Sequence, residues 1–404
     1  MQKLLWLKCL FLIICLPFAK PGRSQTHNPL RTGAEQTEKY FPLLLGKRVA
    51  LVANPTSQIA GTPTVDSLLH SGIRIVKVFG PEHGFRGNAS NGARVSDSFD
   101  PQTGVPIVSL YGKKNRPSES DLADVDIVVF DIQDVGARFY TYILTLQRVM
   151  QSCADFRKPL LILDRPNPNG FYVDGPVLED SLHSGIGGQP IPIVHGMTVG
   201  ELAGMINGEG WLDKHVRCQL TVIRVANYNH NTRYILPVWP SPNLNSQQSI
   251  LLYPSLCLFE GTVISQGRGT HFPFTVLGAP ALEGKYTFSF RPESIPGMSE
   301  TPLHQDTLCY GLDLRNYDTD QFFKTRQLNL QWLIELYAAY PQKEKFFDRS
   351  QSNQIGSFDR LAGTTDLRRQ IIAGTPEAQI RKSWEPRLGE FKKKRKKYLL
   401  YPDF

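Results

Sequence analysis

The chain has 404 residues, 41% of them hydrophobic and 10% aromatic, which is enough for a large packed core in one or two domains. The formal net charge is +8, but six basic residues form the single run Lys392–Lys397 and four more lie in the first 23 residues. The rest of the chain is near neutral, so no broad basic face is expected and nucleic acid is excluded as a partner. We expect the basic run to form a solvated helical surface.

The first 25 residues are predicted to be a secretory signal peptide. Lys3 lies ahead of the apolar run Cys9–Phe18, which is too short for a membrane-spanning helix. A secreted or periplasmic protein follows, with no stable membrane insertion after cleavage. Leu12–Cys15 distantly resembles a bacterial lipoprotein box, but the bulky Ile14 before the cysteine disfavours lipid anchoring.

The four cysteines beyond this leader are widely spaced, with no C-x-x-C pair and no zinc-binding spacing. Each lies in an apolar segment, so we expect buried thiols rather than disulfides. These cysteines are Cys153, Cys218, Cys257 and Cys309.

Apolar strand-like runs alternate with helical segments through the first half of the chain. This alternation predicts an α/β fold with a Rossmann-like, doubly wound, mostly parallel sheet. One predicted helix covers 139–154, and another opens with a capping box formed by Thr198 and Glu201. The predicted strands are 48–53, 73–79, 126–130, 159–163 and 220–225.

The proline-rich segment Pro237–Ser246 predicts a hinge. It divides the chain into an α/β domain, 26–240, and a smaller α+β domain, 241–404. In the second domain we predict strands at 286–290 and 308–314, and helices at 328–340, from Thr375 onward, and in a basic segment ending near Tyr401.

Several cofactor and catalytic motifs are absent from the sequence. The first strand runs into Asn54-Pro-Thr-Ser57 rather than a G-x-G-x-x-G turn, and no P-loop is present, so no nucleotide cofactor is expected. The chain also has no H-E-x-x-H and no G-x-S-x-G, which disfavours a zinc protease and a serine esterase.

Four of the predicted strands end on polar side chains. Because the carboxyl ends of parallel strands meet at one edge of a sheet, these side chains are expected to converge on a ligand site. Any single strand-end aspartate can instead cap the following helix, and this alternative stays open for Asp164. The residues are Asn54; Glu82, His83 and Arg86 in a glycine-rich turn; Asp131 and Asp134; and Asp164 and Arg165.

The segment that follows Phe130 is dense in charged and aromatic residues, including Tyr140. Helical spacing would place Asp131 and Asp134 on one side, and it permits an ion pair between Asp134 and Arg138. In the alternative interpretation, Arg138 binds an anionic substrate group while the aspartates bind sugar hydroxyls or share a proton.

A third cluster lies beyond the hinge, where Glu260 and Arg268 flank a glycine-containing stretch. If the domains face each other, Glu260 can confront Glu82 or Asp131. Two carboxylates across a cleft are what glycoside hydrolysis requires. His195, just before the capped helix, is a candidate donor to a substrate or a structural donor.

Long motifs from about Lys47 to Tyr401 resemble the exo-β-N-acetylmuramidase family of the NamZ type. The resemblance implies a cofactor-free glycoside hydrolase that releases N-acetylmuramic acid from the non-reducing end of peptidoglycan saccharides or muropeptides. It also implies an active site between a Rossmann-like and a smaller domain. The motifs are G-P-E-H-G-F-R-G, F-D-I-Q-D-V-G-A-R-F-Y-T-Y, L-D-R-P-N-P-N-G, P-I-P-I-V-H-G-M-T-V-G-E-L-A, W-P-S-P-N-L and L-F-E-G-T-V-I-S-Q-G-R-G-T.

The resemblance gives Glu82 and Glu260 as the leading catalytic acids, with Asp131 as a further candidate. It does not say which is acid and which is base or nucleophile, and a mechanism assisted by the substrate's acetamido group stays open. The residues expected to bind substrate are Asn54, His83, Arg86, Asp134, Arg138, Tyr140, Asp164, Arg165, His195 and Arg268.

One of three arginines is expected to bind the lactyl carboxylate of muramic acid, because a planar guanidinium can form two hydrogen bonds to a carboxylate. The candidates are Arg86, Arg138 and Arg268. Two rival functions remain. One is a non-catalytic periplasmic muropeptide-binding protein. The other is a metal-dependent hydrolase built on Asp131, Asp134 and His83.

Overall fold

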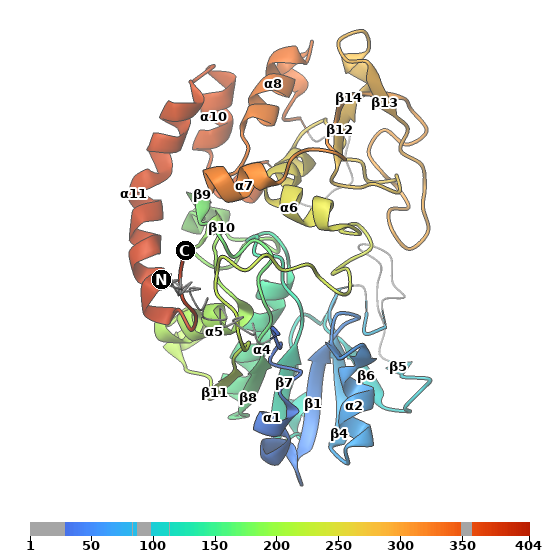
Figure 1. The fold of residues 1–404 in the computed structure, drawn as a ribbon, viewed down its shortest axis with the longest axis vertical. Helices are drawn as coiled ribbons and strands as arrows, with labels where there is room; N and C mark the ends of the chain where they lie inside the picture. The colour runs from blue at the N-terminus through green and yellow to red at the C-terminus, as the bar shows by residue number, and fades with distance from the viewer. Residues whose placement is uncertain (1–28, 83, 87–97, 113, 349–357) are drawn as a thin grey trace, which may run out of the picture.

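The computed structural model describes residues 29–82, 84–86, 98–112, 114–348 and 358–404. A seven-stranded sheet forms one end of the molecule (Figure 1), in the order β11-β8-β7-β1-β4-β6-β5. All neighbouring strands are parallel except β5 and β6, which confirms the predicted α/β class. The strands are β1 (Arg48–Ala53), β4 (Arg74–Gly80), β5 (Ser98–Phe99), β6 (Pro106–Ser109), β7 (Ile127–Asp131), β8 (Leu160–Leu163) and β11 (Leu220–Ile223).

Both faces of this sheet are buried. Along β1, Val49 and Leu51 join the core on one face, whereas Ala50 and Val52 join the core on the other, as the two-residue period of a strand requires. Residues of α1 and α2 belong to the first core, and residues of α3, α4 and α5 belong to the second. The helices are α1 (Thr37–Leu44), α2 (Thr64–His70), α3 (Glu119–Leu122), α4 (Tyr142–Asp155) and α5 (Val199–Gly208).

The capping box predicted at the start of α5 is confirmed. The Thr198 hydroxyl accepts from the Glu201 amide at 3.3 Å, and the Glu201 carboxylate accepts from the Thr198 amide at 2.9 Å. In contrast, the predicted helix from 139 begins only at Tyr142. The segment 132–141 is not helical, so the expectation that Asp131, Asp134 and Arg138 share a helical face is wrong.

The second half of the chain forms a smaller α+β region at the other end of the molecule (Figure 1). Its three-stranded antiparallel sheet has the order β12-β14-β13. Two antiparallel pairs, β9 with β10 and β2 with β3, lie outside both sheets. The further elements are β2 (Gln58–Ile59), β3 (Thr62–Pro63), β9 (Asp174–Val177), β10 (Pro192–Val194), β12 (Val276–Ala279), β13 (Phe288–Phe290), β14 (Cys309–Asp313), α6 (Gln247–Leu256), α7 (Asp320–Thr325), α8 (Gln331–Ala339), α9 (Phe358–Ala362), α10 (Asp366–Ile372), and the short helices η3 (Cys257–Gly261), η5 (Lys343–Lys345) and η6 (Lys396–Tyr398).

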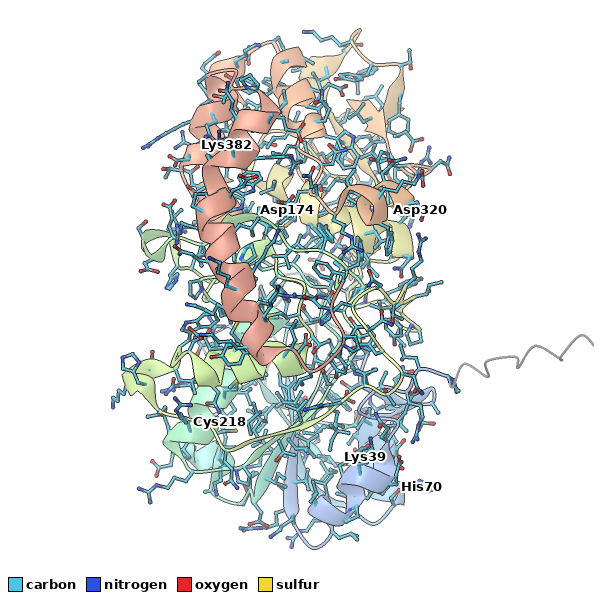
Figure 2. All side chains as sticks on the ribbon, turned by 60° about the vertical axis from the view of Figure 1, so that its left-hand side comes forward. Lys39, His70, Asp174, Cys218, Asp320 and Lys382 are labelled. Atoms are coloured by element: carbon cyan, nitrogen blue, oxygen red, sulfur yellow. The ribbon has the colours of Figure 1, made fainter. Side chains whose placement is uncertain are left out.

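The long helix α11 (Glu377–Arg395) connects the two ends of the molecule (Figure 2). We predicted two helices here, but one continuous helix runs through Pro386 and continues into η6. Arg381 in its first half pairs with Asp174 of β9 at 3.0 Å. Its last residue, Arg395, donates to the Gly196 carbonyl at 2.6 Å, so α11 is fixed at both ends.

The basic run at the end of α11 is solvated only in part. Lys392, Lys393, Lys396 and Lys397 are exposed, as expected. Arg395 is instead buried and forms an ion pair with Asp403 at 2.8 Å, so the expectation is wrong for this residue.

One hydrophobic cluster extends through both halves of the molecule. It includes Ala50 of β1, Leu256 of α6, Leu336 of α8 and Leu388 of α11. Residues on both sides of the predicted division at Pro240 therefore contribute to a single core.

The four cysteines of the described residues are buried and free, which confirms the predicted thiols. Among the described residues, no helix is both long and apolar enough to cross a membrane. The predicted signal peptide lies outside the described residues.

Candidate active site

The carboxyl edge of the large sheet faces the segment that leads into α6. The Tyr142 hydroxyl, at the start of α4, donates to the Pro240 carbonyl at 3.3 Å. The ring of Tyr140 lies edge-on to that of Tyr253 in α6, with the ring centroids 5.8 Å apart. The segment between β7 and α4 thus contacts the second half directly.

Glu82 lies at this edge, two residues beyond β4. Its side chain accepts a hydrogen bond from the Thr141 hydroxyl at 3.1 Å and is partly exposed. Tyr111 lies beside it, and burial together with the charge of Glu82 raises the pKa of Tyr111 to about 12. His83 and the part of the glycine-rich turn from Gly87 onward lie outside the described residues.

Glu260 belongs to η3, in the second half of the chain, and its side chain is 14% exposed. Its Oε1 atom receives three donors: Arg268 Nε at 2.7 Å, Arg268 Nη2 at 2.6 Å and Gln266 Nε2 at 3.2 Å. The Cys257 thiol is also close enough to hydrogen-bond to this carboxylate. The Arg268 guanidinium also lies over the Phe274 ring, and its Nη1 is buried without a partner in the described part of the chain.

Three tyrosine rings separate the two glutamates. Tyr142, Tyr140 and Tyr253 pack edge to face, with centroid distances of 5.0 Å and 5.8 Å. Burial is the main cause that raises the pKa of each tyrosine; the charge of Glu82 adds to it at Tyr140 and Tyr142, and that of Glu260 at Tyr253. Glu82 is therefore near two of the packed rings, and Glu260 is near the third.

Asp134 and His195 form a second buried polar group at this edge. Asp134 Oδ2 accepts from the Gly136 amide at 2.7 Å and lies 3.7 Å from His195 Nε2. His195 Nδ1 accepts from the Met197 amide at 3.2 Å, which assigns the proton of a neutral ring to Nε2. Asp134 Oδ1 and His195 Nε2 are buried and make no hydrogen bond with the described residues.

Asn54 directly follows β1, at the same carboxyl edge of the large sheet. Its Oδ1 accepts from the Thr56 hydroxyl at 2.5 Å and from the Thr56 amide at 3.0 Å. These bonds fix its amide group next to Tyr142, the ring whose pKa is also affected by Glu82 and Asp134.

Asp131, the further catalytic candidate, is fully buried and both of its carboxylate oxygens are occupied. Oδ1 accepts from Arg165 Nε at 2.7 Å, and Oδ2 accepts from the Thr64 hydroxyl at 2.6 Å. The geometry of Asp131 and Arg165 is that of an ion pair that joins the ends of β7 and β8.

Asp164 caps the start of α5. This is the alternative interpretation, in which a strand-end aspartate caps a helix rather than binding a ligand. It accepts from the Thr198 hydroxyl at 2.7 Å, from the Gly200 amide at 2.8 Å and from the Tyr401 hydroxyl at 2.5 Å. Burial raises the pKa of Asp164 to about 6, although these hydrogen bonds oppose the shift.

Arg86 and Arg138 use most of their guanidinium donors within the protein, although Arg138 Nε is buried without a partner in the described structure. Arg86 pairs with Asp100 at 2.7 Å and with Asp66 at 3.2 Å. Arg138 is 1% exposed and donates to three backbone carbonyls, and burial lowers its pKa to about 9. The predicted pair between Arg138 and Asp134 is not formed.

Comparison with known proteins identifies the family of this chain. Residues 49–248 match the family described as "Exo-beta-N-acetylmuramidase NamZ, N-terminal", and residues 251–401 match its C-terminal counterpart. The chain belongs to the NamZ family. The predicted resemblance is confirmed, as is the prediction that the chain is an enzyme of the glycoside hydrolase class.

The similarity to individual NamZ relatives extends over nearly the whole chain. The peptidoglycan β-N-acetylmuramidase NamZ of Bacillus subtilis (strain 168) is 39% identical over 378 residues, which are 90% of this chain and 89% of that protein. Crystal structures of two DUF1343 family proteins of Bacteroides fragilis match with TM-scores of 0.84 and 0.77. They are 45% and 28% identical and cover 93% and 92% of this chain, and 100% and 99% of their own chains.

Several residues of the site in this NamZ-family chain were not singled out from the sequence. Tyr142 and Thr141 lie in the F-Y-T-Y motif, so the motif itself was a usable signal. Tyr111, Tyr253 and Gln266 carry no local signal, because only the fold brings them to Glu82 and Glu260.

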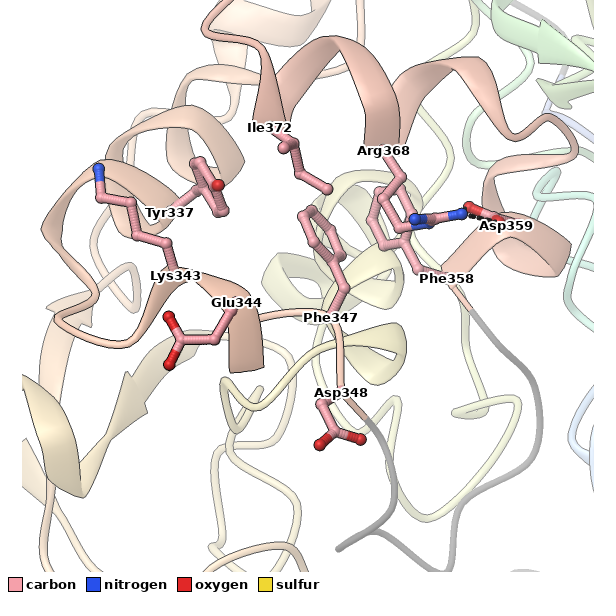
Figure 3. Close-up of a pocket in the computed structure, with 9 residues that line it drawn as sticks. All are labelled: Tyr337, Lys343, Glu344, Phe347, Asp348, Phe358, Asp359, Arg368 and Ile372. Carbon is pink, nitrogen blue, oxygen red and sulfur yellow. Dashed lines mark hydrogen bonds and ion pairs between the residues drawn. The ribbon is translucent and has the colours of Figure 1, made fainter.

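A pocket elsewhere in the NamZ fold does not involve the two glutamates. A pocket of about 400 Å³ lies in the second half (Figure 3), where it is lined by rings such as Phe347 and Phe358 and by charged residues such as Lys343 and Glu344. None of the predicted site residues lines it. Within the described ranges, no group of three or more histidine, cysteine or acidic residues is arranged to hold a metal ion.

Proposed function

We propose that this protein is an exo-β-N-acetylmuramidase that removes N-acetylmuramic acid from the non-reducing end of peptidoglycan saccharides or muropeptides. Membership of the NamZ family and the similarity to the Bacillus subtilis enzyme support the reaction class. The observation that carries the proposal is a row of three packed tyrosine rings that has Glu82, from the first half of the molecule, near Tyr140 and Glu260, from the second half, near Tyr253.

The surroundings of the two glutamates favour different roles. Glu260 is charge-paired with Arg268 through Oε1, and a carboxylate next to a guanidinium suits a base or a nucleophile. Among the described residues, the neutral hydroxyl groups of Thr141 and Tyr111 lie next to the side chain of Glu82. A carboxyl group in such a setting suits proton donation to the leaving glycosidic oxygen.

Arg268 is the arginine that we assign to the lactyl carboxylate of the substrate. Arg86 pairs with two aspartates, and Arg138 donates to three backbone carbonyls. Arg138 Nε is also buried without a partner among the described residues, but of the three arginines it is Arg268 that pairs with Glu260. Arg268 retains one buried donor, Nη1, that has no partner among the described residues. A carboxylate that accepted this hydrogen bond would distinguish a muramic from a glucosaminic sugar.

Asp134 and His195 are proposed to bind sugar hydroxyls. Their free atoms, one acceptor and one donor, match the two functions of a hydroxyl group. Asp131 and Arg165 are proposed to hold the neighbouring loops in place rather than to contact the sugar, because both oxygens of Asp131 are occupied.

The test is turnover of a chromogenic N-acetylmuraminide by the mature protein, with and without a chelator. We expect turnover that survives chelation. Binding without turnover would support the periplasmic receptor, and loss on chelation would support a metal-dependent hydrolase. Glu385→Gln, on the exposed face of α11, is the matched control for variants of Glu82 and Glu260.

We also propose that the protein acts after export, in the periplasm or outside the cell. The apolar leader supports this location, and the bulky residue before Cys15 disfavours lipid anchoring. Mass spectrometry of the protein recovered from its producing cells tests the location, because an unmodified mature chain that begins near residue 26 is expected.

A further inference from the structure

A pocket of about 410 Å³ opens beside the carboxyl edge of the large sheet, away from both catalytic glutamates. It lies between the segment ahead of α1, the loop that follows β1, and the segment that contains Tyr234 and Ile235. We infer that this pocket binds a primary ammonium group carried on an aliphatic stem. The inference goes beyond the proposed muramidase activity and does not depend on it.

The charge that faces the pocket is that of Glu35. Its Oε2 atom accepts from the Thr32 amide at 2.7 Å and from the Thr32 hydroxyl at 3.0 Å, which fixes the carboxylate. Its Oε1 atom accepts no hydrogen bond from a described residue. Arg31 does not neutralise this carboxylate, because it donates to the Glu35 backbone carbonyl and to the side chain of Glu38.

The other charged residue of the lining, Arg165, is already compensated. Its Nε donates to Asp131 at 2.7 Å, and its Nη2 donates to the Gln58 carbonyl at 3.1 Å. The pair with Asp131 is buried, so the pocket and its immediate wall carry one net negative charge, from Glu35. This balance favours a cation over a carboxylate as the ligand.

The remaining lining suits the aliphatic part of such a ligand. Ile235 is 71% exposed, an unusual position for a large apolar side chain, and Pro237 lies beside it in the lining. The ring of Tyr234 is close enough to both Glu35 and Arg165 for their charges to affect its pKa. An ammonium group next to an aromatic ring and a carboxylate, with its alkyl stem against Ile235, would use all three features.

One residue of the pocket lining, Thr56, also contacts a residue of the proposed active site. Thr56, in the lining, donates to Asn54 Oδ1 at 2.5 Å and accepts from the Gln133 amide at 3.0 Å. A ligand in the pocket would therefore be separated from Asn54 by one side chain.

Ligand-observed NMR titration of the full mature protein with cadaverine, 1,5-diaminopentane, tests the inference. We expect saturable binding of cadaverine in the millimolar range, and much weaker binding of pentanoate, which has the same aliphatic character but the opposite charge. Glu35→Gln should weaken cadaverine binding about tenfold, because a charge-assisted contact is lost while the amide oxygen can still accept from Thr32. Ile235→Ser should weaken it about threefold through loss of apolar contact.

Glu385→Gln, on the exposed face of α11, is the matched control, since it removes a carboxylate that does not line the pocket. It should leave cadaverine binding unchanged. The inference is overturned if cadaverine shows no binding at about 20 mM, if pentanoate binds equally well, or if Glu35→Gln and Glu385→Gln have the same effect. The titration measures binding and not turnover. Absence of cadaverine binding would therefore leave the muramidase proposal intact, and absence of turnover of an N-acetylmuraminide would leave this inference intact.

Discussion

The polar residues at the carboxyl edge of the large sheet, together with Glu260 and Arg268 from the second half of the chain, form two groups. We call them the anchored half and the open half of the site, and they differ in how their polar atoms are used. In the anchored half, formed by Asp131, Asp164 and Arg165, the carboxylate oxygens are hydrogen-bonded within the protein. In the open half, formed by Glu82, Asp134, His195 and Glu260 with its partner Arg268, buried atoms remain without partners among the described residues. A buried polar atom without a partner costs free energy, so its retention points to a ligand that satisfies it.

The largest effect on stability is expected from the anchored half. Arg165→Met leaves the carboxylate of Asp131 buried without its ion-pair partner, which should lower the free energy of unfolding by about 3–5 kcal/mol. Urea denaturation measures this change. Glu82→Gln, in the open half, should change it by less than about 1 kcal/mol; a comparable loss in both variants would remove the distinction between the halves.

Asp164 should give the anchored half a pH dependence. Its pKa is raised from 3.8 to about 6 in the fold, so between pH 4 and pH 6 the native state binds more protons than the unfolded state, and stability falls as pH rises. The difference amounts to about 3 kcal/mol. Thermal unfolding of the wild type and Asp164→Asn across this range measures it, and the variant should lack this part of the slope. An unchanged slope in Asp164→Asn would show that other groups cause it.

A substitution of Arg268 tests whether the open half recognises the lactyl carboxylate of the substrate. Arg268→Lys keeps a positive charge near Glu260 but replaces the three guanidinium nitrogens with one ammonium group, so Nη1, the donor that has no partner in the described structure, is lost. We expect kcat/KM for an N-acetylmuraminide to fall about 10- to 100-fold, and any activity on an N-acetylglucosaminide to fall much less. Equal losses on both substrates would assign Arg268 to support of Glu260 alone.

The smallest effect is expected at the contact between the chain end and the anchored half. Tyr401→Phe removes the hydrogen bond to Asp164 and should lower the free energy of unfolding by about 1–2 kcal/mol, without a change in kcat. Denaturation and steady-state kinetics on the same preparation measure both quantities. A large fall in kcat would mean that the anchored half takes part in turnover.

Much of the fold could be predicted because its signals are local. The strands are apolar runs, and the capping box of α5 lies within four residues. The interruption in the helix before Tyr142 and the continuous α11 were missed because tertiary contacts decide them. One example is the contact of Arg381 with Asp174, which lies 207 residues away in the sequence.

The site was predictable only as a set of strand-end residues. Asp131, Asp134 and Asp164 are equivalent in the sequence, since each follows an apolar strand and precedes a helix or loop. Their separation into anchored and open groups depends on distant partners such as Tyr401 and Thr64, which no local pattern indicates. For the same reason, three arginines were equal candidates until the partners of Arg86 and Arg138 were known.

The most direct test of the account compares kcat for Glu82→Gln, Glu260→Gln and Asp131→Asn on a chromogenic N-acetylmuraminide, in preparations whose folding is confirmed by circular dichroism. We predict that kcat falls by about 10²–10⁴-fold in each of the two glutamate variants, as expected for loss of an acid–base group, and by less than about tenfold in folded Asp131→Asn. A large loss in Asp131→Asn together with near wild-type turnover in Glu82→Gln would contradict the account.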